Sequence, residues 1–207
     1  MSSRPRRYLA LGDSYTIGEG VTEAERWPAR LAAQLQAAGL VLDPVRYLAT
    51  TGWSSDELAQ AISATALPGP WDLVSLLIGV NDQYRGHPAA SRRSLIADLI
   101  ERSVMLAGDR TRVLAVSIPD WSVTTFARDS GRDLAAIAGQ IDAYNAMIAG
   151  LCASAGVAWI DVTACSRAHP DELAADGLHP GAAQYLRWAE KLLPEALQAL
   201  QQPSGSR

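Results

Sequence analysis

The sequence has 207 residues, of which 48% are hydrophobic and 19% charged, and its formal net charge is −4. This composition is typical of a folded globular protein of one domain, and the negative charge argues against nucleic acid as a main partner. No run approaches the roughly 18 apolar residues of a membrane span, so we expect no membrane-spanning segment.

The basic residues up to Arg7 are followed by only a short apolar stretch, residues 8–11, far shorter than the core of a signal peptide. We therefore expect a cytoplasmic protein in which Cys152 and Cys165 are free thiols. The sequence contains no linker or repeat, so a single domain over residues 1–207 is predicted, with disordered tails at 1–6 and 201–207. Nothing in it specifies an oligomeric state.

Five short apolar runs are predicted to be buried strands, because each has the length of a strand and is bounded by turn residues. They lie at residues 8–11, 45–48, 73–78, 113–118 and 157–162. Strands that alternate with helices indicate a parallel sheet covered on both faces. We therefore predict an α/β protein, a three-layer α/β/α sandwich with a five-stranded parallel sheet, flavodoxin-like.

Apolar residues recur at helical spacing between these strands and after the last one, which predicts amphipathic helices. Their stripes run from Trp27 to Leu35, from Ile96 to Val104, from Leu134 to Ile148 and through Leu186, Ala189, Leu193 and Leu197. A shorter helix is predicted from Ser54 to Ala64, with Ser54 or Ser55 as its cap. Residues 119–131 are predicted to form a long loop at the edge of the sheet.

Four motifs of glycine and polar residues occur in a fixed order along the chain. They are Gly12-Asp13-Ser14-Tyr15, Thr51-Gly52-Trp53-Ser54, Gly79-Val80-Asn81-Asp82 and Asp176-Gly177-Leu178-His179-Pro180. Each of the first three follows a predicted strand, and the carboxyl ends of parallel strands meet at one edge of a sheet. We therefore expect the chemistry of the protein at that edge.

Ser14 is the candidate nucleophile of the first motif. Gly12 permits a tight turn before it, so that the Ser14 hydroxyl projects above the sheet and its N–H stays free at a helix start. Taken alone, Ser14 could equally be the cap of that helix. Asp13 is interpreted as a hydrogen-bond acceptor that holds the loop rather than as a catalytic acid.

Asp176 and His179 are the candidate orienting carboxylate and base. Asp176 can reach one imidazole nitrogen across the Gly177 turn and leave the other nitrogen facing Ser14. Gly52 and Asn81 can donate N–H groups to a developing oxyanion, although each could also be an ordinary turn residue. A metal site is the alternative for the Asp-His pair, but no further ligands accompany it at suitable spacing.

The four motifs together resemble those of the SGNH or GDSL-type esterase and lipase family, over nearly the whole chain. The resemblance implies a catalytic triad of Ser14, Asp176 and His179, and an oxyanion hole formed by Ser14, Gly52 and Asn81. Tyr15 stands where the family has the leucine that gives it its name. Because that position is not catalytic, the change bears on the shape of the pocket.

The expected function is that of a cofactor-free, metal-free serine hydrolase that cleaves small esters of short acyl chains through an acyl-enzyme. Trp53, Tyr84, Trp121 and Phe126 are predicted to wall the substrate pocket, because no long apolar groove or lid is evident. Transfer of the acyl group to another acceptor and cleavage of a thioester remain alternatives that use the same residues. A non-catalytic module that binds acylated or sugar ligands is the alternative of another class.

Overall fold

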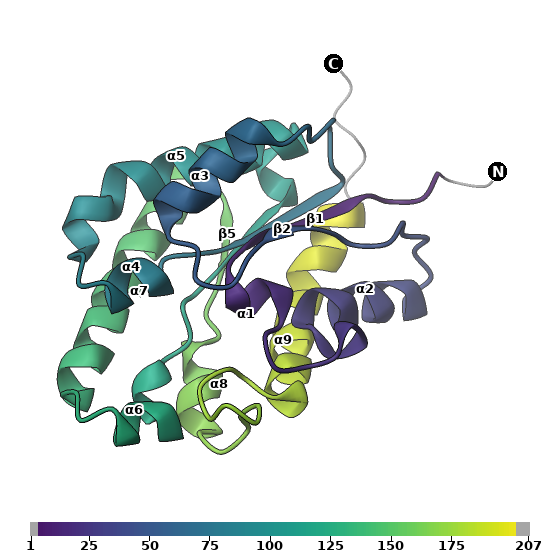
Figure 1. The fold of residues 1–207 in the computed structure, drawn as a ribbon. Helices are drawn as coiled ribbons and strands as arrows, with labels where there is room; N and C mark the ends of the chain where they lie inside the picture. Colours follow the sequence, from purple (N-terminus) through teal and green to yellow (C-terminus); the bar gives the residue numbers. More distant parts are fainter. Residues whose placement is uncertain (1–3, 202–207) are drawn as a thin grey trace.

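A five-stranded parallel sheet forms the centre of the protein in a computed structural model, which describes residues 4–201 (Figure 1). The strand order is β2-β1-β3-β4-β5, and every neighbouring pair is parallel. The strands are β1 (Tyr8–Gly12), β2 (Arg46–Ala49), β3 (Leu73–Leu77), β4 (Val113–Val116) and β5 (Ala158–Ile160). The predicted fold is confirmed, because each strand begins and ends within two residues of its apolar run.

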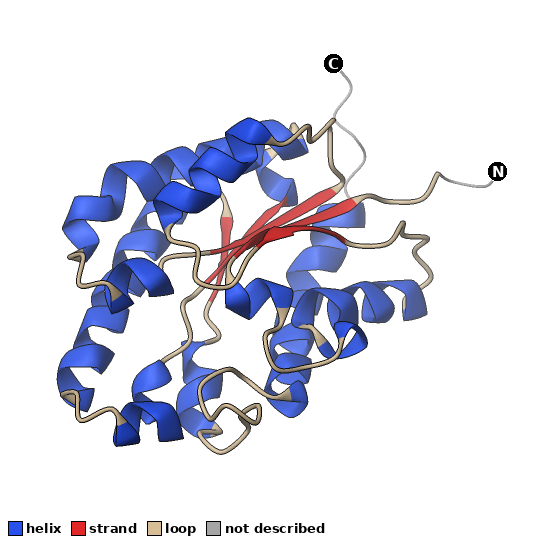
Figure 2. Ribbon diagram, in the orientation of Figure 1, coloured by secondary structure: helices blue, strands red, loops and turns tan. Residues whose placement is uncertain are grey.

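Helices cover both faces of this sheet (Figure 2). Helices α2 (Trp27–Ala37) and α9 (Ala182–Gln201) pack together on one face. The other face is covered by α3 (Ser55–Ala64), α5 (Ala89–Ala107) and α7 (Leu134–Ala155). Four short helices lie among the connections: α1 (Ser14–Ile17), α4 (Val80–Tyr84), α6 (Thr125–Asp129) and α8 (Thr163–Ala168). None of the helices within residues 4–201 is long and apolar enough to cross a membrane.

The buried face of α9 overlaps the predicted stripe only in part: Ala189 is buried, and Leu193 and Leu197 are partly buried against the core. Leu186, expected in the core, is 37% exposed. The face that packs against the sheet carries Tyr185, Trp188, Ala189, Leu192 and Ala196. Tyr185 and Trp188 are fully buried there, and large aromatic side chains contribute strongly to the free energy gained by burial.

Residues 119–131 are more structured than the predicted long loop. A 3-10 turn, Trp121–Val123, is capped by Asp120, whose carboxylate accepts a hydrogen bond from the Ser122 N–H at 2.9 Å. Helix α6 follows, and the Thr124 hydroxyl accepts from the Ala127 N–H at 3.1 Å. These caps satisfy N–H groups that an open loop would leave to solvent.

The predicted disordered tail at residues 1–6 includes residues that the structure shows to be held by contacts. The two terminal nitrogens of the Arg4 guanidinium, Nη1 and Nη2, donate to the Asp72 carboxylate at 2.8 Å. The backbone N–H of Arg6 donates to the Val41 carbonyl at 2.7 Å. Gln201, placed in the carboxy-terminal tail, is the last residue of α9. The rest of the two predicted tails, residues 1–3 and 202–207, lies outside the described residues.

Candidate active site

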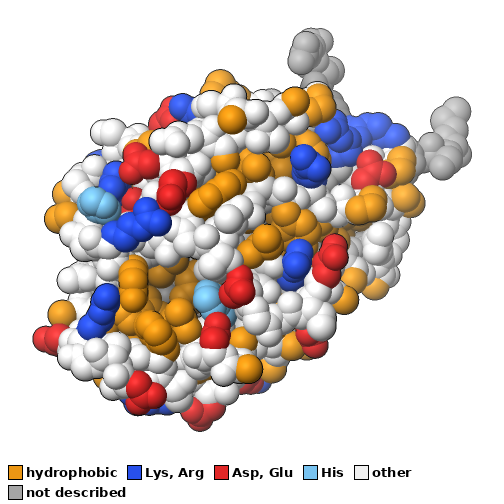
Figure 3. Space-filling view, in the orientation of Figure 1, with side chains coloured by type: hydrophobic (Ala, Val, Ile, Leu, Met, Phe, Trp, Pro, Cys, Tyr) orange, Lys and Arg blue, Asp and Glu red, His pale blue; other side chains and the backbone are white. Residues whose placement is uncertain are grey.

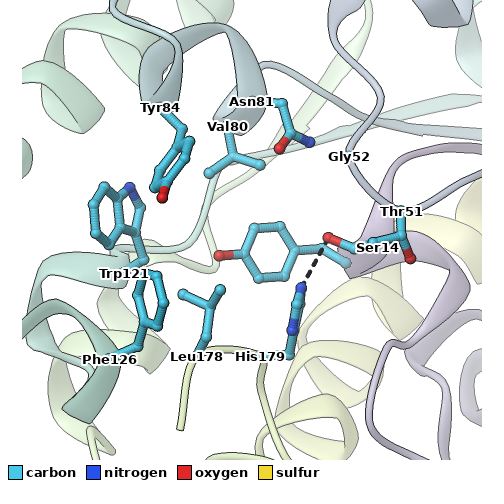
Figure 4. Close-up of a pocket in the computed structure, with 11 residues that line it drawn as sticks. Ser14, Thr51, Gly52, Val80, Asn81, Tyr84, Trp121, Phe126, Leu178 and His179 are labelled. Carbon is cyan, nitrogen blue, oxygen red and sulfur yellow. Dashed lines mark hydrogen bonds between the residues drawn. The ribbon is translucent and has the colours of Figure 1, made fainter. Parts of the chain in front are cut away.

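The four motifs converge at the carboxyl edge of the sheet, around a cavity of about 250 Å³ (Figure 4). The first three follow β1, β2 and β3, and the fourth precedes α9. The lining residues are Ser14, Tyr15, Thr51, Gly52, Val80, Asn81, Tyr84, Trp121, Phe126, Leu178 and His179.

Ser14 is the first residue of α1 and comes two residues after the end of β1. The Asp13 carboxylate caps this helix by accepting from the Tyr15 N–H at 3.0 Å, as predicted. Gly12 has a different role from the one expected: a Cβ there would lie 2.1 Å from the Thr16 hydroxyl oxygen and 2.5 Å from the Leu77 carbonyl oxygen. Close packing against β3 and α1, rather than a tight turn, therefore requires glycine at this position.

A continuous chain of hydrogen bonds joins Ser14 to the fourth motif. The Ser14 hydroxyl lies 3.0 Å from His179 Nε2, and His179 Nδ1 lies 2.6 Å from Asp176 Oδ2. Ser14 and His179 are only 5% and 9% exposed. The structure thus brings together the three residues that the motifs single out, across 165 positions of sequence.

Asp176 is held as a carboxylate. Partial burial by itself would raise its pKa, but hydrogen bonds from the His179 ring and from the N–H groups of Leu178 and His179 hold that pKa below its usual range. An ionised Asp176 accepts the Nδ1 proton of His179, which leaves Nε2 as an acceptor toward Ser14.

The turn that carries Asp176 and His179 is fixed at its base and at its tip. Leu173 and Pro180 form an antiparallel bridge, and the Ala174 N–H donates to the His179 carbonyl at 2.8 Å. At the tip, the Gly177 carbonyl accepts hydrogen bonds from the Thr125 hydroxyl and the Phe126 N–H. Helix α6 therefore helps to set the position of the histidine.

Three of the residues that line the cavity, Ser14, Gly52 and Asn81, carry N–H donors. The backbone N–H groups of Ser14 and Gly52 donate to no other group among residues 4–201. The Asn81 amide donates one hydrogen to the Trp53 carbonyl at 2.9 Å, and in Figure 4 its nitrogen is turned toward Gly52. The second hydrogen of this amide remains available for an oxygen atom bound in the cavity.

Hydrogen bonds join the segments that carry the second and third motifs. Gly52 has φ +84°, a left-handed backbone conformation that residues other than glycine rarely adopt. Its carbonyl accepts a hydrogen bond from the Arg85 guanidinium at 2.7 Å. Buried Asp82 accepts from both the N–H and the hydroxyl of Ser55, at 2.9 and 2.8 Å. These contacts hold the Gly52 and Asn81 donors in one arrangement.

An aromatic wall closes the end of the cavity remote from Ser14. Tyr84, Trp121 and Phe126 contact one another, with ring centroids 5.5 and 6.3 Å apart for the two successive pairs. The Trp121 indole is 2% exposed and donates to the Gln83 side chain at 2.8 Å. Three of the four predicted pocket residues thus line the cavity, and one of them is fixed by a buried hydrogen bond.

Trp53, the fourth predicted pocket residue, does not line this cavity. Its side chain packs against the hydrophobic core instead. The backbone carbonyl of Trp53 accepts the hydrogen bond from the Asn81 amide, and in this way it supports a residue that lines the cavity. The sequence analysis linked Tyr15 to the shape of the pocket but missed Thr51, Val80 and Leu178 as lining residues. These three lie inside the motifs, next to a residue that was assigned, so motif adjacency was the signal that could have found them.

The space-filling view shows hydrophobic side chains gathered around a hollow beside a histidine on this face (Figure 3). Within residues 4–201, no three His, Cys, Asp or Glu side chains are grouped so that they could hold a metal ion. The cavity therefore offers a hydroxyl, an imidazole with its carboxylate, three N–H donors and an apolar wall.

Comparison with solved structures shows that the fold is shared. The lipase/acylhydrolase from Enterococcus faecalis has a TM-score of 0.74 at 20% identity, with 97% of this chain and 100% of that chain covered. A carbohydrate acetylesterase family member from Sinorhizobium meliloti has 0.72 at 20%, covering 95% and 100%. The psychrotrophic esterase EstA from Pseudoalteromonas sp., in a structure inhibited by monoethylphosphonate, has 0.70 at 15%, covering 95% and 100%.

A search of curated proteins found no match. The sequence model described as the GDSL-like Lipase/Acylhydrolase family matches residues 10–187, a span that contains all four motifs. The chain belongs to the GDSL-like lipase/acylhydrolase family, the SGNH esterases.

Proposed function

We propose that this protein hydrolyses carboxylic esters of short acyl chains with Ser14 as nucleophile. His179 Nε2 takes the hydroxyl proton as Ser14 Oγ bonds to the ester carbonyl carbon, and the carbonyl electron pair moves to oxygen. The N–H groups of Ser14 and Gly52 and the Asn81 amide bind that oxyanion. When the tetrahedral intermediate collapses, the ester C–O bond breaks and the alcohol leaves with the proton from His179. Water then attacks the acyl-enzyme by the same steps, releasing the acid and restoring Ser14.

The observation that carries this proposal is the chain Ser14–His179–Asp176, with its distances of 3.0 and 2.6 Å, beside three available N–H donors. Preorganised donors at the developing charge are commonly the largest contribution to catalysis of acyl transfer. A binding module has no need of a hydroxyl, a base and an orienting carboxylate aligned in this way.

The size of the cavity supports a short acyl chain. Its volume of about 250 Å³ is below the range of roughly 300 to 1,000 Å³ usual for drug-sized ligands. Trp121 ends the cavity on the side away from Ser14 and is held there through Gln83. Among the similar structures, one is described as a carbohydrate acetylesterase family member, and acetyl is a two-carbon acyl group.

Labelling with a fluorophosphonate tests the proposal, because only a serine activated by a base beside an oxyanion hole reacts readily with it. Intact-mass and peptide analysis are expected to find one adduct, on Ser14, in the folded protein. The Ser14→Ala variant should give none, whereas Ser91→Ala, at an exposed serine on α5, should be labelled like the wild type. Folded wild-type protein without an adduct on Ser14 would refute the assignment.

A panel of p-nitrophenyl esters from acetate to palmitate, with alcohol acceptors and thioesters in parallel, then defines the reaction. We expect hydrolysis of acetate to butyrate esters to exceed that of laurate and palmitate. Faster product formation with an alcohol acceptor would indicate acyl transfer instead. Activity should also survive exhaustive treatment with EDTA, and a loss reversed by a divalent ion would reassign Asp176 and His179 as metal ligands.

A further inference from the structure

The Tyr15 side chain places a polar group in the cavity that the proposed reaction does not use. Tyr15 lines the cavity directly after Ser14, and its ring meets the His179 imidazole edge-on with centroids 5.5 Å apart. The side chain is 3% exposed, yet its hydroxyl forms no hydrogen bond within residues 4–201. A phenol hydroxyl that is removed from bulk water normally has a partner.

Other tyrosine hydroxyls of this protein are either paired or closed off from the cavity. The Tyr8 hydroxyl pairs with Ser75 at 2.9 Å, and the Tyr144 hydroxyl donates to the His87 carbonyl at 2.7 Å. The Tyr47 and Tyr185 hydroxyls are also unpaired, but both are completely enclosed by protein. The Tyr15 hydroxyl is not enclosed in that way, since the side chain borders the cavity. A ligand in the cavity can therefore supply the missing partner.

The surroundings keep this hydroxyl neutral and make it a donor. Burial, followed by the nearby carboxylates of Asp13, Asp176 and Asp120, raises the pKa of Tyr15 above its ordinary value. Tyr15 also borders a second cavity of only about 10 Å³, whose polar residues Asp120, Thr124, Ser166 and Gln184 make their hydrogen bonds elsewhere. In the main cavity, the lining residues Val80 and Leu178 are apolar. The Tyr15 side chain thus borders the cavity that the proposed function assigns to the acyl chain.

We propose that Tyr15 is a specificity-determining residue, whose hydroxyl donates a hydrogen bond to an oxygen atom on the acyl chain of the substrate. The preferred substrates are then esters whose short acyl group carries an ether, keto or hydroxyl oxygen, rather than plain alkanoates. This inference rests on the proposed function, because it takes the acyl-enzyme at Ser14 as given.

Two p-nitrophenyl esters of equal chain length test this inference, the butyrate and the methoxyacetate, which differ by an oxygen in place of a methylene. Tyr15→Phe removes only the hydroxyl and is expected to lower kcat/KM for the methoxyacetate by about 3-fold to 10-fold, the range for one neutral hydrogen bond. The butyrate value should stay within about two-fold or rise, since no polar group is lost to it. The quantity compared between proteins is the ratio of kcat/KM for the methoxyacetate to kcat/KM for the butyrate. The different intrinsic reactivities of the two esters cancel in this comparison.

Tyr84→Phe is the matched control, because Tyr84 lines the same cavity but is 42% exposed, so water can satisfy its hydroxyl. Its selectivity ratio should equal that of the wild type. Tyr15→Leu, with the leucine of the family motif, should shift the ratio in the same direction as Tyr15→Phe and serves if that variant folds poorly. An unchanged ratio in the folded Tyr15 variants would overturn the inference, whereas a wild type that hydrolyses neither ester and takes no label on Ser14 would overturn the proposed function.

Discussion

The buried carboxyl group of Asp13 is expected to make the protein less stable as the pH rises from 5 to 7. Asp13 is 0% exposed, and although one oxygen caps α1, the other is enclosed without a hydrogen-bond partner. Burial raises the pKa of Asp13 to about 8, and nearby Asp82 adds to the effect, while the hydrogen bond from the Tyr15 N–H opposes it. In the unfolded chain the same group titrates near its ordinary value of about 4.

The magnitude follows from proton linkage. Between the unfolded and folded pKa values the native state binds one more proton than the unfolded state, so the free energy of unfolding falls by about 1.4 kcal/mol per pH unit. From pH 5 to 7 the loss is about 2.7 kcal/mol. In Asp13→Asn the amide oxygen still caps α1, and nothing titrates at this site. The free energy of unfolding of the variant, minus that of the wild type, should therefore rise by about 2 to 3 kcal/mol over this range.

Urea unfolding of both proteins at pH 5, 6 and 7 measures this difference. Other titrating groups are common to the two proteins and cancel, and a constant offset from the new amide does not change with pH. Asp109→Asn is the matched control: Asp109 caps a 3-10 turn, but hydrogen bonds from Thr111 hold its pKa below its usual range, so the difference should stay flat. A flat difference for Asp13→Asn as well would mean that Asp13 is already ionised in the folded protein at pH 5, and the burial argument would fail.

Three further predictions concern the site. Asn81→Ala should lower kcat by about 100-fold to 1,000-fold, the usual loss for one oxyanion donor, and an unchanged kcat would remove Asn81 from the oxyanion hole. The value of kcat/KM should fall on the acid side of its pH profile with the slope of a single proton. The reason is that His179 must be neutral to accept the Ser14 proton, while Asp176 stays ionised. A slope of two protons would contradict this assignment. Phe126→Ala should move the preferred acyl chain upward with little change in Tm, since Phe126 is 37% exposed. Trp121→Ala should move it too, but with a loss of roughly 3 to 5 kcal/mol in stability; an unmoved optimum in both variants would mean that these rings only pack their own segment.

The strands and the pairing of Asp176 with His179 could be predicted because their signals are local. Each central strand is buried on both faces, so it appears in the sequence as a nearly continuous apolar run, as in residues 113–116. Asp176 and His179 are three residues apart, and their hydrogen bond needs only the Gly177 turn between them. A triad whose acid lay on another strand would not have been recognisable from spacing.

The face of α9 could not be assigned in the same way. Two overlapping stripes fit a helical period, one through Leu186 and Leu193 and one through Tyr185 and Trp188. The choice depends on the surface that the sheet and α2 present to the helix, which periodicity does not describe. Trp53 was misplaced for a similar reason, because a large aromatic residue beside a motif can turn toward the core as readily as toward the site.

The shape of the pocket depends on contacts between distant segments, and this limits what spacing can predict. Trp121 closes the cavity because Gln83 accepts its indole N–H, and Gln83 in turn donates to Gln140 on α7 at 2.7 Å. None of these three positions has a local reason to pair with the others. Ser14, Gly52 and Asn81, by contrast, follow the ends of the neighbouring strands β1, β2 and β3, which the fold itself aligns. Substitutions at Gln83 or Gln140 would therefore leave the motifs intact while changing which acyl chains fit, so members of the family with the same motifs can differ in substrate.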